Sequence, residues 1–150
     1  MPTKTKLRAA ALDGTTDDVE AAFYEALQRG DIDALVACWA DEDDVFCVHP
    51  GGPRLVGMPA IRAAFEQMFS HGAIHARPAH VRKVDSLTSA VHSVLERLEV
   101  LAPDGPQHAF VLATNVYQRT AQGWRMVAHH ASPGTARAPD EANDARQTLH

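Results

Sequence analysis

The chain is predicted to fold as an α+β domain, with its helices on one face of an antiparallel sheet. Between residues 16 and 69, apolar residues recur every three or four positions in three segments, which is the periodicity of amphipathic helices. After Gly72 the pattern changes to alternation of polar and apolar residues, and short turn sequences separate the alternating segments. Helices followed by a run of strands are typical of the α+β class.

Each predicted helix has a recognisable start or end. The first follows Thr15, which forms a capping-box pattern with Asp18, and it ends before Gly30, which suits a left-handed stop. The second follows the N-cap residue Asp31, and the third begins near Pro59, since proline is favoured in a first helical turn. The three apolar faces comprise, in order, Val19, Ala22, Phe23, Ala26 and Leu27; Ile32, Leu35, Val36 and Trp39; and Ile61, Ala64, Phe65, Met68 and Phe69.

The strands are predicted from alternation and from the turns between them. A short apolar strand over residues 45–49 lies between the first helices and the third, and it stops at Pro50-Gly51-Gly52. Residues 74–85 form a weaker strand, in which Pro78 confines the first half to an edge or a bulge. Short turns then join three strands into an antiparallel meander, which covers residues 90–101, 107–120 and 124–132.

Composition and charge narrow the class of protein. The 150 residues suffice for one domain with a core of its own, and 45% of them are hydrophobic. The formal net charge is −5 and no element carries a stripe of Lys and Arg, so no nucleic-acid partner is expected. Cys38 and Cys47 lie among apolar residues, and we interpret both as reduced core residues.

The two ends of the chain differ from its middle. The start is basic but lacks an apolar stretch long enough for a signal peptide, and no segment reaches the roughly 20 apolar residues of a membrane span. We therefore expect a cytoplasmic protein with no membrane partner. Residues 1–14 and 134–150 show no periodicity, so we expect a disordered arm and a flexible tail on either side of one domain over residues 15–133.

Four segments of core and turn residues resemble one known superfamily. They are residues 26–35, Trp39-Ala40-Asp41, residues 57–62 and residues 123–127. In this order they are similar to the nuclear transport factor two-like, or SnoaL-like, superfamily, which includes ketosteroid isomerase and the polyketide cyclases. The resemblance implies a cone-shaped barrel of a bent antiparallel sheet covered by three N-terminal helices. It also implies an apolar pocket at the open end of the cone that admits a small molecule.

In this resemblance, two residues fall at catalytic positions of ketosteroid isomerase. His49 precedes Pro50, where that enzyme has an Asp-Pro pair carrying its general base, and an imidazole suits proton transfer at neutral pH. Asn115 falls where that enzyme has the protonated carboxylic acid of its oxyanion hole, and its amide can donate a hydrogen bond to a ligand oxygen. Each has a structural alternative: His49 would bond the following loop, and Asn115 would be a core amide bonded to a neighbouring element.

The other site residues follow from the resemblance and from strand alternation. Phe23 aligns with the oxyanion-hole tyrosine, and Tyr24, one position later, is expected to point elsewhere. His129 and His130 point to opposite faces, and we favour His130 for the pocket because related proteins commonly have a histidine there; its alternative is a satisfied histidine under the helices. Glu96 would serve as an acid or base if it points inward, and would pair with neighbouring charges if it points outward. The predicted ligand-binding residues are Trp39, Phe23, Phe65 and Glu96.

Two classes of function stay open. The first is a proton-transfer enzyme (an isomerase, cyclase or dehydratase) that acts on a small apolar molecule containing oxygen, with His49 as the base and Asn115 or His130 polarising an oxygen. The second is a non-catalytic ligand-binding or dimeric assembly module. No cofactor is expected, and the nine histidines lack the spacing of a zinc site, so no metal is expected. Strands 90–101 and 107–120 are apolar on both faces, which predicts a homodimer through the outer face of the sheet.

Overall fold

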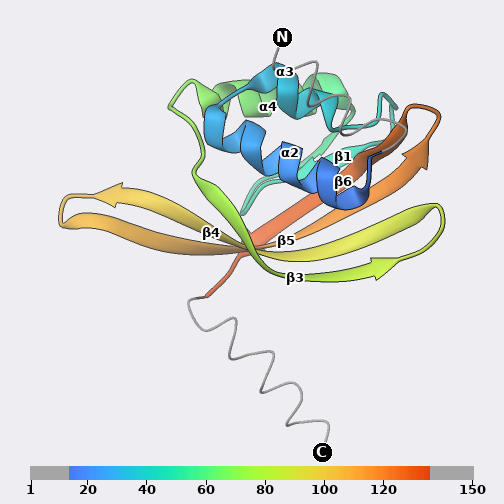
Figure 1. Ribbon diagram of the computed structural model, residues 1–150. Helices are drawn as coiled ribbons and strands as arrows, with labels where there is room; N and C mark the ends of the chain where they lie inside the picture. Colours follow the sequence, from blue (N-terminus) through green and yellow to red (C-terminus); the bar gives the residue numbers. More distant parts are fainter. Residues whose placement is uncertain (1–13, 136–150) are drawn as a thin grey trace, which may run out of the picture.

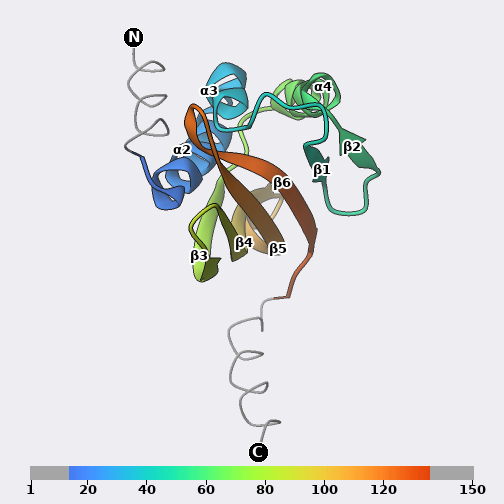
Figure 2. The same cartoon turned by 90° about the vertical axis from the view of Figure 1, so that its right-hand side faces the viewer.

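Helices and sheet form two layers in the computed structural model, which describes residues 14–135 (Figure 1). The helices in this range are α2 (Thr16–Arg29), α3 (Ile32–Ala37) and α4 (Met58–Phe69). The strands are β1 (Phe46–Val48), β2 (Arg54–Val56), β3 (Ala76–Asp85), β4 (Ser89–Ala102), β5 (Gly105–Thr120) and β6 (Gly123–Pro133). Figure 2 shows that all three helices lie on the same side of the curved meander β3–β6. The predicted α+β fold with helices over one sheet face is confirmed.

The strands form one open, mixed sheet in the order β2-β1-β6-β5-β4-β3. Within it the meander β3–β6 is antiparallel throughout, as predicted. β1 lies parallel to β6, with Cys47 opposite His129, and β2 extends the sheet beyond β1. The expectation of a wholly antiparallel sheet is therefore corrected at one pair of strands. The reason is that β1 and β6 are far apart in the chain, and a long connection can bring two strands together in either direction.

The helix ends follow the capping residues that the sequence indicates. The Thr15 hydroxyl accepts a hydrogen bond from the Asp18 backbone N–H at 3.2 Å, and the Asp18 carboxylate accepts one from the Thr15 N–H at 2.9 Å. Gly30 ends α2 with φ 63°, a left-handed conformation that glycine adopts without steric cost. The Asp31 carboxylate then accepts from the Ala34 N–H at 3.1 Å and starts α3. These caps fix where α2 and α3 turn back over the sheet.

Strand β3 is an edge strand with an irregular middle, as Pro78 predicts. Its pairing with β4 shifts register between Ala79 and Arg82, and His80 in this interval has φ 46°. A proline cannot donate to a neighbouring strand, so it is tolerated at an edge or a bulge. The irregularity bends the strand toward the helices at its start, as Figure 1 shows.

A second irregularity lies in β6 and decides which residues face the core. Val116 pairs with Ala128 whereas the next residue of β5, Tyr117, pairs with Met126, so β6 contains one extra residue between them. Such a β-bulge reverses the alternation of side chains along the strand. As a result Met126 and His129 are both buried, although alternation without a bulge would place them on opposite faces.

The core fills the space between the helices and the concave sheet face. Its largest apolar side chains with no more than 2% exposure come from every layer, and include Phe23, Tyr24, Leu35, Ile61, Phe65, Val94, Tyr117 and Met126. Cys38 and Cys47 are both buried and neither forms a disulfide, as the sequence predicts. Burial raises the pKa of the Cys47 thiol to about 12, with a contribution from the nearby Glu96 charge, so this thiol stays protonated and behaves as a small apolar residue.

The expectations for the two ends of the chain fall largely outside the described residues. Only Gly14 of the expected arm, and Gly134 and Thr135 of the expected tail, lie within them. Gly134 continues the sheet, since its N–H donates to the Phe110 carbonyl at 2.8 Å. Among the described helices, none has both the length and the apolar character needed to cross a membrane.

Candidate functional site

A cavity of about 80 Å³ lies between α2, α4 and the concave face of the sheet. Three polar side chains line it, from His49, Glu96 and His129. Its remaining walls are apolar and comprise Phe23, Leu27, Pro50, Phe65, Met68, Ile74, Ala76, Leu98, Val111 and Ala131. A concave, mostly apolar space with a few convergent polar groups is the usual form of a small-molecule site.

His49 reaches this cavity from the end of β1. Its ring packs edge-on against Phe65, with 4.8 Å between ring centroids, and lies 6.4 Å from the ring of His129. The following turn is held by the His49 backbone carbonyl, which accepts from the Gly52 N–H at 2.8 Å, while the imidazole Nε2 lies 3.8 Å from Cys47 Sγ. Burial lowers the pKa of His49 below its ordinary 6.5. The ring is therefore mainly unprotonated at neutral pH and can accept a proton.

Glu96 lies in the middle of β4 and points inward. Its side chain accepts a hydrogen bond of 2.7 Å from the Tyr24 hydroxyl of α2, and only 6% of the residue is exposed. Burial raises the pKa of the Glu96 carboxyl to about 7, and the hydrogen bond from Tyr24 limits the rise. At neutral pH the protonated and ionised forms of Glu96 are therefore both populated, which is the condition for a general acid or base.

A chain of buried hydrogen bonds stands behind Glu96. The Tyr24 oxygen accepts from Asn115 Nδ2 at 3.1 Å, and Asn115 Oδ1 is bonded to His129 Nδ1. Burial, with smaller contributions from the charges of His49 and His130, lowers the pKa of His129 to about 3, so this ring is neutral. Since Asn115 Oδ1 can only accept, Nδ1 of His129 carries the ring proton. The donors thus run in one direction, from His129 through Asn115 and Tyr24 to Glu96.

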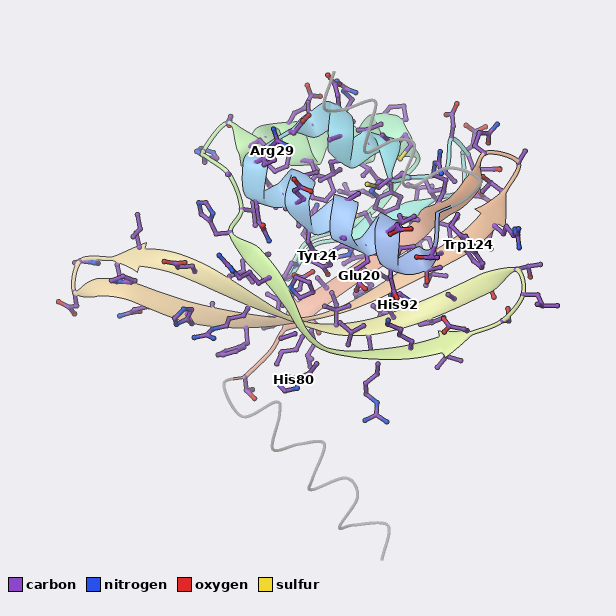
Figure 3. All side chains as sticks on the ribbon, in the orientation of Figure 1. Glu20, Tyr24, Arg29, His80, His92 and Trp124 are labelled. Atoms are coloured by element: carbon purple, nitrogen blue, oxygen red, sulfur yellow. The ribbon has the colours of Figure 1, made fainter. Side chains whose placement is uncertain are left out.

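This chain changes the place expected for Asn115. Its residue is fully buried and both ends of its amide bond protein groups, so it supports Tyr24 and His129 from behind the cavity wall. The prediction that it faces a ligand directly is corrected, and the structural alternative of a bonded core amide describes it. The reason is that the Tyr24 hydroxyl of α2, which Figure 3 shows below that helix, lies between Asn115 and Glu96 and takes up the Asn115 amide donor.

The expected place of His130 is wrong. Its side chain lies on the outer face of the sheet, in a separate hollow of about 490 Å³ that also contains Thr114 and Ser132. The β6 bulge is the cause, because it turns His129 inward and His130 outward. Nothing in the amino-acid sequence reveals this bulge. Strict alternation from Trp124 onward therefore predicts that His130 points inward and His129 outward.

The expectation that Tyr24 points elsewhere is also wrong. Phe23 and Tyr24 are both buried, with ring centroids 5.2 Å apart and ring planes at 84°, because α2 lies deep in the cone and presents two adjacent positions to it. A signal was available in the sequence. Glu96 and Asn115 are polar residues in apolar strands, and a buried tyrosine hydroxyl is the kind of partner that such groups need.

The predicted ligand-binding residues divide into two groups. Phe23, Phe65 and Glu96 line the cavity. Trp39 belongs to the core, beside Met126, and its indole nitrogen is buried without a hydrogen-bond partner among the described residues. Trp39 is not among the residues that line the cavity, so its predicted contact with a ligand has no support from this geometry.

Comparisons with known proteins agree with this architecture. The SnoaL-like domain profile matches residues 17–136. A candidate calcium/calmodulin-dependent protein kinase type II association domain from Thiobacillus denitrificans is 36% identical, with a TM-score of 0.75 over 83% of this chain and 98% of that chain. A candidate dehydratase of the NTF2-like family from Streptomyces avermitilis is 29% identical, with a TM-score of 0.71 over 81% and 95%.

More distant structures share the fold alone. An uncharacterized protein with a cystatin-like fold from Caulobacter vibrioides is 15% identical, with a TM-score of 0.71 over 87% of this chain and 95% of that chain. Among curated proteins, none matches this sequence.

Proposed function

Since the chain belongs to the SnoaL-like domain family, we propose that it is a proton-transfer enzyme acting on a small apolar molecule that contains oxygen. Among such reactions we favour dehydration, because a structure 29% identical to this chain is a candidate dehydratase; isomerisation or cyclisation would use the same groups. The observation that carries the proposal is that His49 and Glu96 line one cavity, the first mainly unprotonated and the second partly protonated at neutral pH. A base and an acid held in one apolar space are the two groups that such reactions need.

In a dehydration, each of these residues has a defined step. His49 takes a proton from the carbon next to a carbonyl, and a carbon–carbon double bond forms as the neighbouring carbon–oxygen bond breaks. Glu96 gives its proton to the departing hydroxyl, which leaves as water. The similarity to a candidate dehydratase, at 29% identity, supports this assignment.

The hydrogen bonds behind Glu96 position the proposed acid. Tyr24 donates to Glu96 and is itself held by Asn115, so the carboxyl cannot rotate freely in the cavity. Asn115 and His129 thereby act as positioning residues. His130 lies on the outer face and does not line the cavity.

The size of the cavity limits the substrate. Its volume of about 80 Å³ is smaller than an apolar cavity of roughly 150 Å³ that holds benzene. The reacting part of the substrate is therefore a few heavy atoms long. A longer molecule would extend past the exposed Pro50 at the rim.

The test uses a panel of short 3-hydroxy ketones and 3-hydroxy thioesters, whose dehydration produces a conjugated product with ultraviolet absorbance. We expect turnover of at least one member, and a loss of about 100-fold or more in kcat for His49→Gln and for Glu96→Gln. His71→Gln is the matched control, since it changes an exposed imidazole outside the cavity, and it should leave kcat unchanged. Full activity in either cavity variant, or no turnover of any member, would contradict the proposal.

An assembly module is the second candidate, favoured by the outer face of the sheet. Phe46, Val56, Val84 and Val91 are between 36% and 73% exposed. The strand registers place them in one apolar row across all described strands, in the order Val84, Val91, Val116, Ala128, Phe46 and Val56. A second copy of this chain, packed through the same row, would cover it as a homodimer. The similarity to an association domain supports oligomerisation, and this role is compatible with an active cavity on the opposite face.

The expected cytoplasmic location stays a prediction. The finding that no described helix can cross a membrane does not identify the compartment.

A further inference from the structure

A second polar cluster lies under the N-terminal half of α2, outside the cavity. It consists of Asp17 and Glu20 of α2 and His92 of β4, whose nearest ligand-type atoms all lie within 4.8 Å of one another. Figure 3 shows Glu20 on the lower side of α2, directly above His92. These residues are not close in sequence, since 72 positions separate Glu20 from His92, and this is why histidine spacing gave no sign of them.

Two members of the cluster are buried and incompletely bonded. His92 is fully buried and Glu20 is 6% exposed, and 3.1 Å separates His92 Nδ1 from Glu20 Oε2. The second atom of each group, His92 Nε2 and Glu20 Oε1, is buried without a hydrogen-bond partner among the described residues. Polar atoms in this condition are destabilising, so the pair is not explained as a satisfied structural contact.

We propose that Asp17, Glu20 and His92 bind a divalent transition-metal cation, with Zn²⁺ as its representative. Two carboxylates and one imidazole are a ligand set that suits such ions, whereas Mg²⁺ and Ca²⁺ prefer oxygen alone. Bonds of about 2.0–2.1 Å to a tetrahedral zinc ion place two ligand atoms roughly 3.3 Å apart. The separation of 3.1 Å between His92 Nδ1 and Glu20 Oε2 is close to this value. Asp17, at the exposed end of the cluster, supplies the third ligand, and water supplies the fourth.

The groups around His92 fit the same arrangement. A metal on Nδ1 requires the ring proton on Nε2, and Asp85 Oδ1 lies 4.0 Å from that nitrogen on an exposed side chain that can approach. A carboxylate that accepts from the second nitrogen of a metal-bound histidine is a frequent feature of such sites. Lys83 opposes binding, because its ammonium group donates to Asp17 Oδ1 at 2.7 Å and must leave when that carboxylate turns to the metal.

The cation would connect the helix layer to the sheet. Glu20 and Tyr24 are four residues apart, on the same face of α2. A metal that ties Glu20 to β4 would therefore also fix the part of α2 that holds the Tyr24 hydroxyl on Glu96. This effect needs only the fold, so the metal proposal does not depend on whether the cavity is catalytic.

The experiment titrates the full chain, first treated with a chelator, with Zn²⁺ and with Mg²⁺ by calorimetry and by thermal unfolding. We expect one Zn²⁺ per chain with a raised melting temperature, no effect of Mg²⁺, and visible absorbance of a four-coordinate site with Co²⁺. Glu20→Gln should weaken Zn²⁺ binding at least tenfold, and Asp17→Asn gives the same test at an exposed position if the first variant does not fold. Lys83→Met should tighten binding several-fold, a result that a purely structural ion pair does not produce.

Two controls separate this site from other histidines. Glu25→Gln changes another glutamate of α2 and should leave the affinity unchanged, as should the double substitution of His71 and His75 by Asn. Zn²⁺ binding that survives Glu20→Gln and Asp17→Asn, or that is lost with His71 and His75, would overturn the proposal. No binding of Zn²⁺ below millimolar concentration would overturn it as well.

Discussion

Replacing Glu96 by Gln should change how the stability of the chain depends on pH. The pKa of this carboxyl is about 7 in the folded chain, against an ordinary value of 4.5. Between these two values the unfolded chain loses the proton while the folded chain retains it. The free energy of unfolding of the wild type therefore falls as pH rises through this interval, whereas Glu96→Gln has no proton to lose at this position.

The size of the effect follows from the two pKa values. They differ by about 2.5, and one pKa unit corresponds to roughly 1.4 kcal/mol, so the wild type loses about 3 kcal/mol relative to Glu96→Gln between pH 4.5 and pH 7. Below pH 4.5 both forms of the chain keep the proton, and the difference in stability between wild type and variant should be constant.

Urea unfolding at fixed pH values between 4 and 8 measures this difference directly. His129 also titrates in part of this range in the unfolded chain, but it is present in both proteins, so its contribution cancels in the comparison. A difference in unfolding free energy that stays constant from pH 4.5 to 7 would refute the reasoning. In that case the Glu96 pKa is not raised by burial, and its proposed role as an acid loses its basis.

Three further outcomes are expected. Tyr24→Phe removes the hydrogen bond that limits the rise in the pKa of Glu96, so carboxyl-carbon NMR should show this pKa higher by about one unit. A shift of this size is expected because a hydrogen bond to a charged group contributes about 1.5–3 kcal/mol. An unchanged titration of Glu96 would contradict the assignment. The pKa of His129 is about 3 in the folded chain against an ordinary 6.5, so the unfolded chain takes up this proton first and the free energy of unfolding falls as pH drops from 6.5 toward 3. In urea unfolding, His129→Gln should reduce this dependence on pH. Equal dependence on pH in wild type and variant would argue against the assignment. Val91→Lys places a charge in the outer apolar row, so light scattering should give the monomer mass of 16.3 kDa for this variant. The wild type should give twice that mass, as should the control Leu87→Lys, whose position is 87% exposed in a turn. A monomeric wild type would exclude the dimer.

Much of the fold could be predicted because local rules agree with the final packing. The capping box at Thr15, the stop at Gly30 and the Asp31 cap act over three or four residues, so the sequence displays them directly. Pro78 likewise marks an edge strand through its own missing N–H group. Strand β2 was missed because three residues between a Pro-Gly turn and a helix carry too little alternation to be recognised.

The site was less predictable because it depends on contacts between distant residues. The resemblance to ketosteroid isomerase placed His49 correctly at the cavity, whereas the sequence left open whether Glu96 points inward. The choice between His129 and His130 depends on one extra residue in β6, which only the pairing with β5 reveals. The cluster of Glu20 and His92 depends on how α2 lies across β4, and no spacing within either element shows it.

The adjacent pair His129 and His130 joins the two faces of the sheet. His129 begins the hydrogen-bond chain that ends at Glu96, and a positive charge on His130 contributes to its lowered pKa. A charged molecule bound in the outer hollow, beside His130, would therefore alter the proton affinity of His129 inside. By thermodynamic reciprocity, a ligand that favours one charge state in the cavity would alter binding at the outer face to the same extent. Two consecutive imidazoles thus couple occupancy on one side of a single-layer sheet to chemistry on the other.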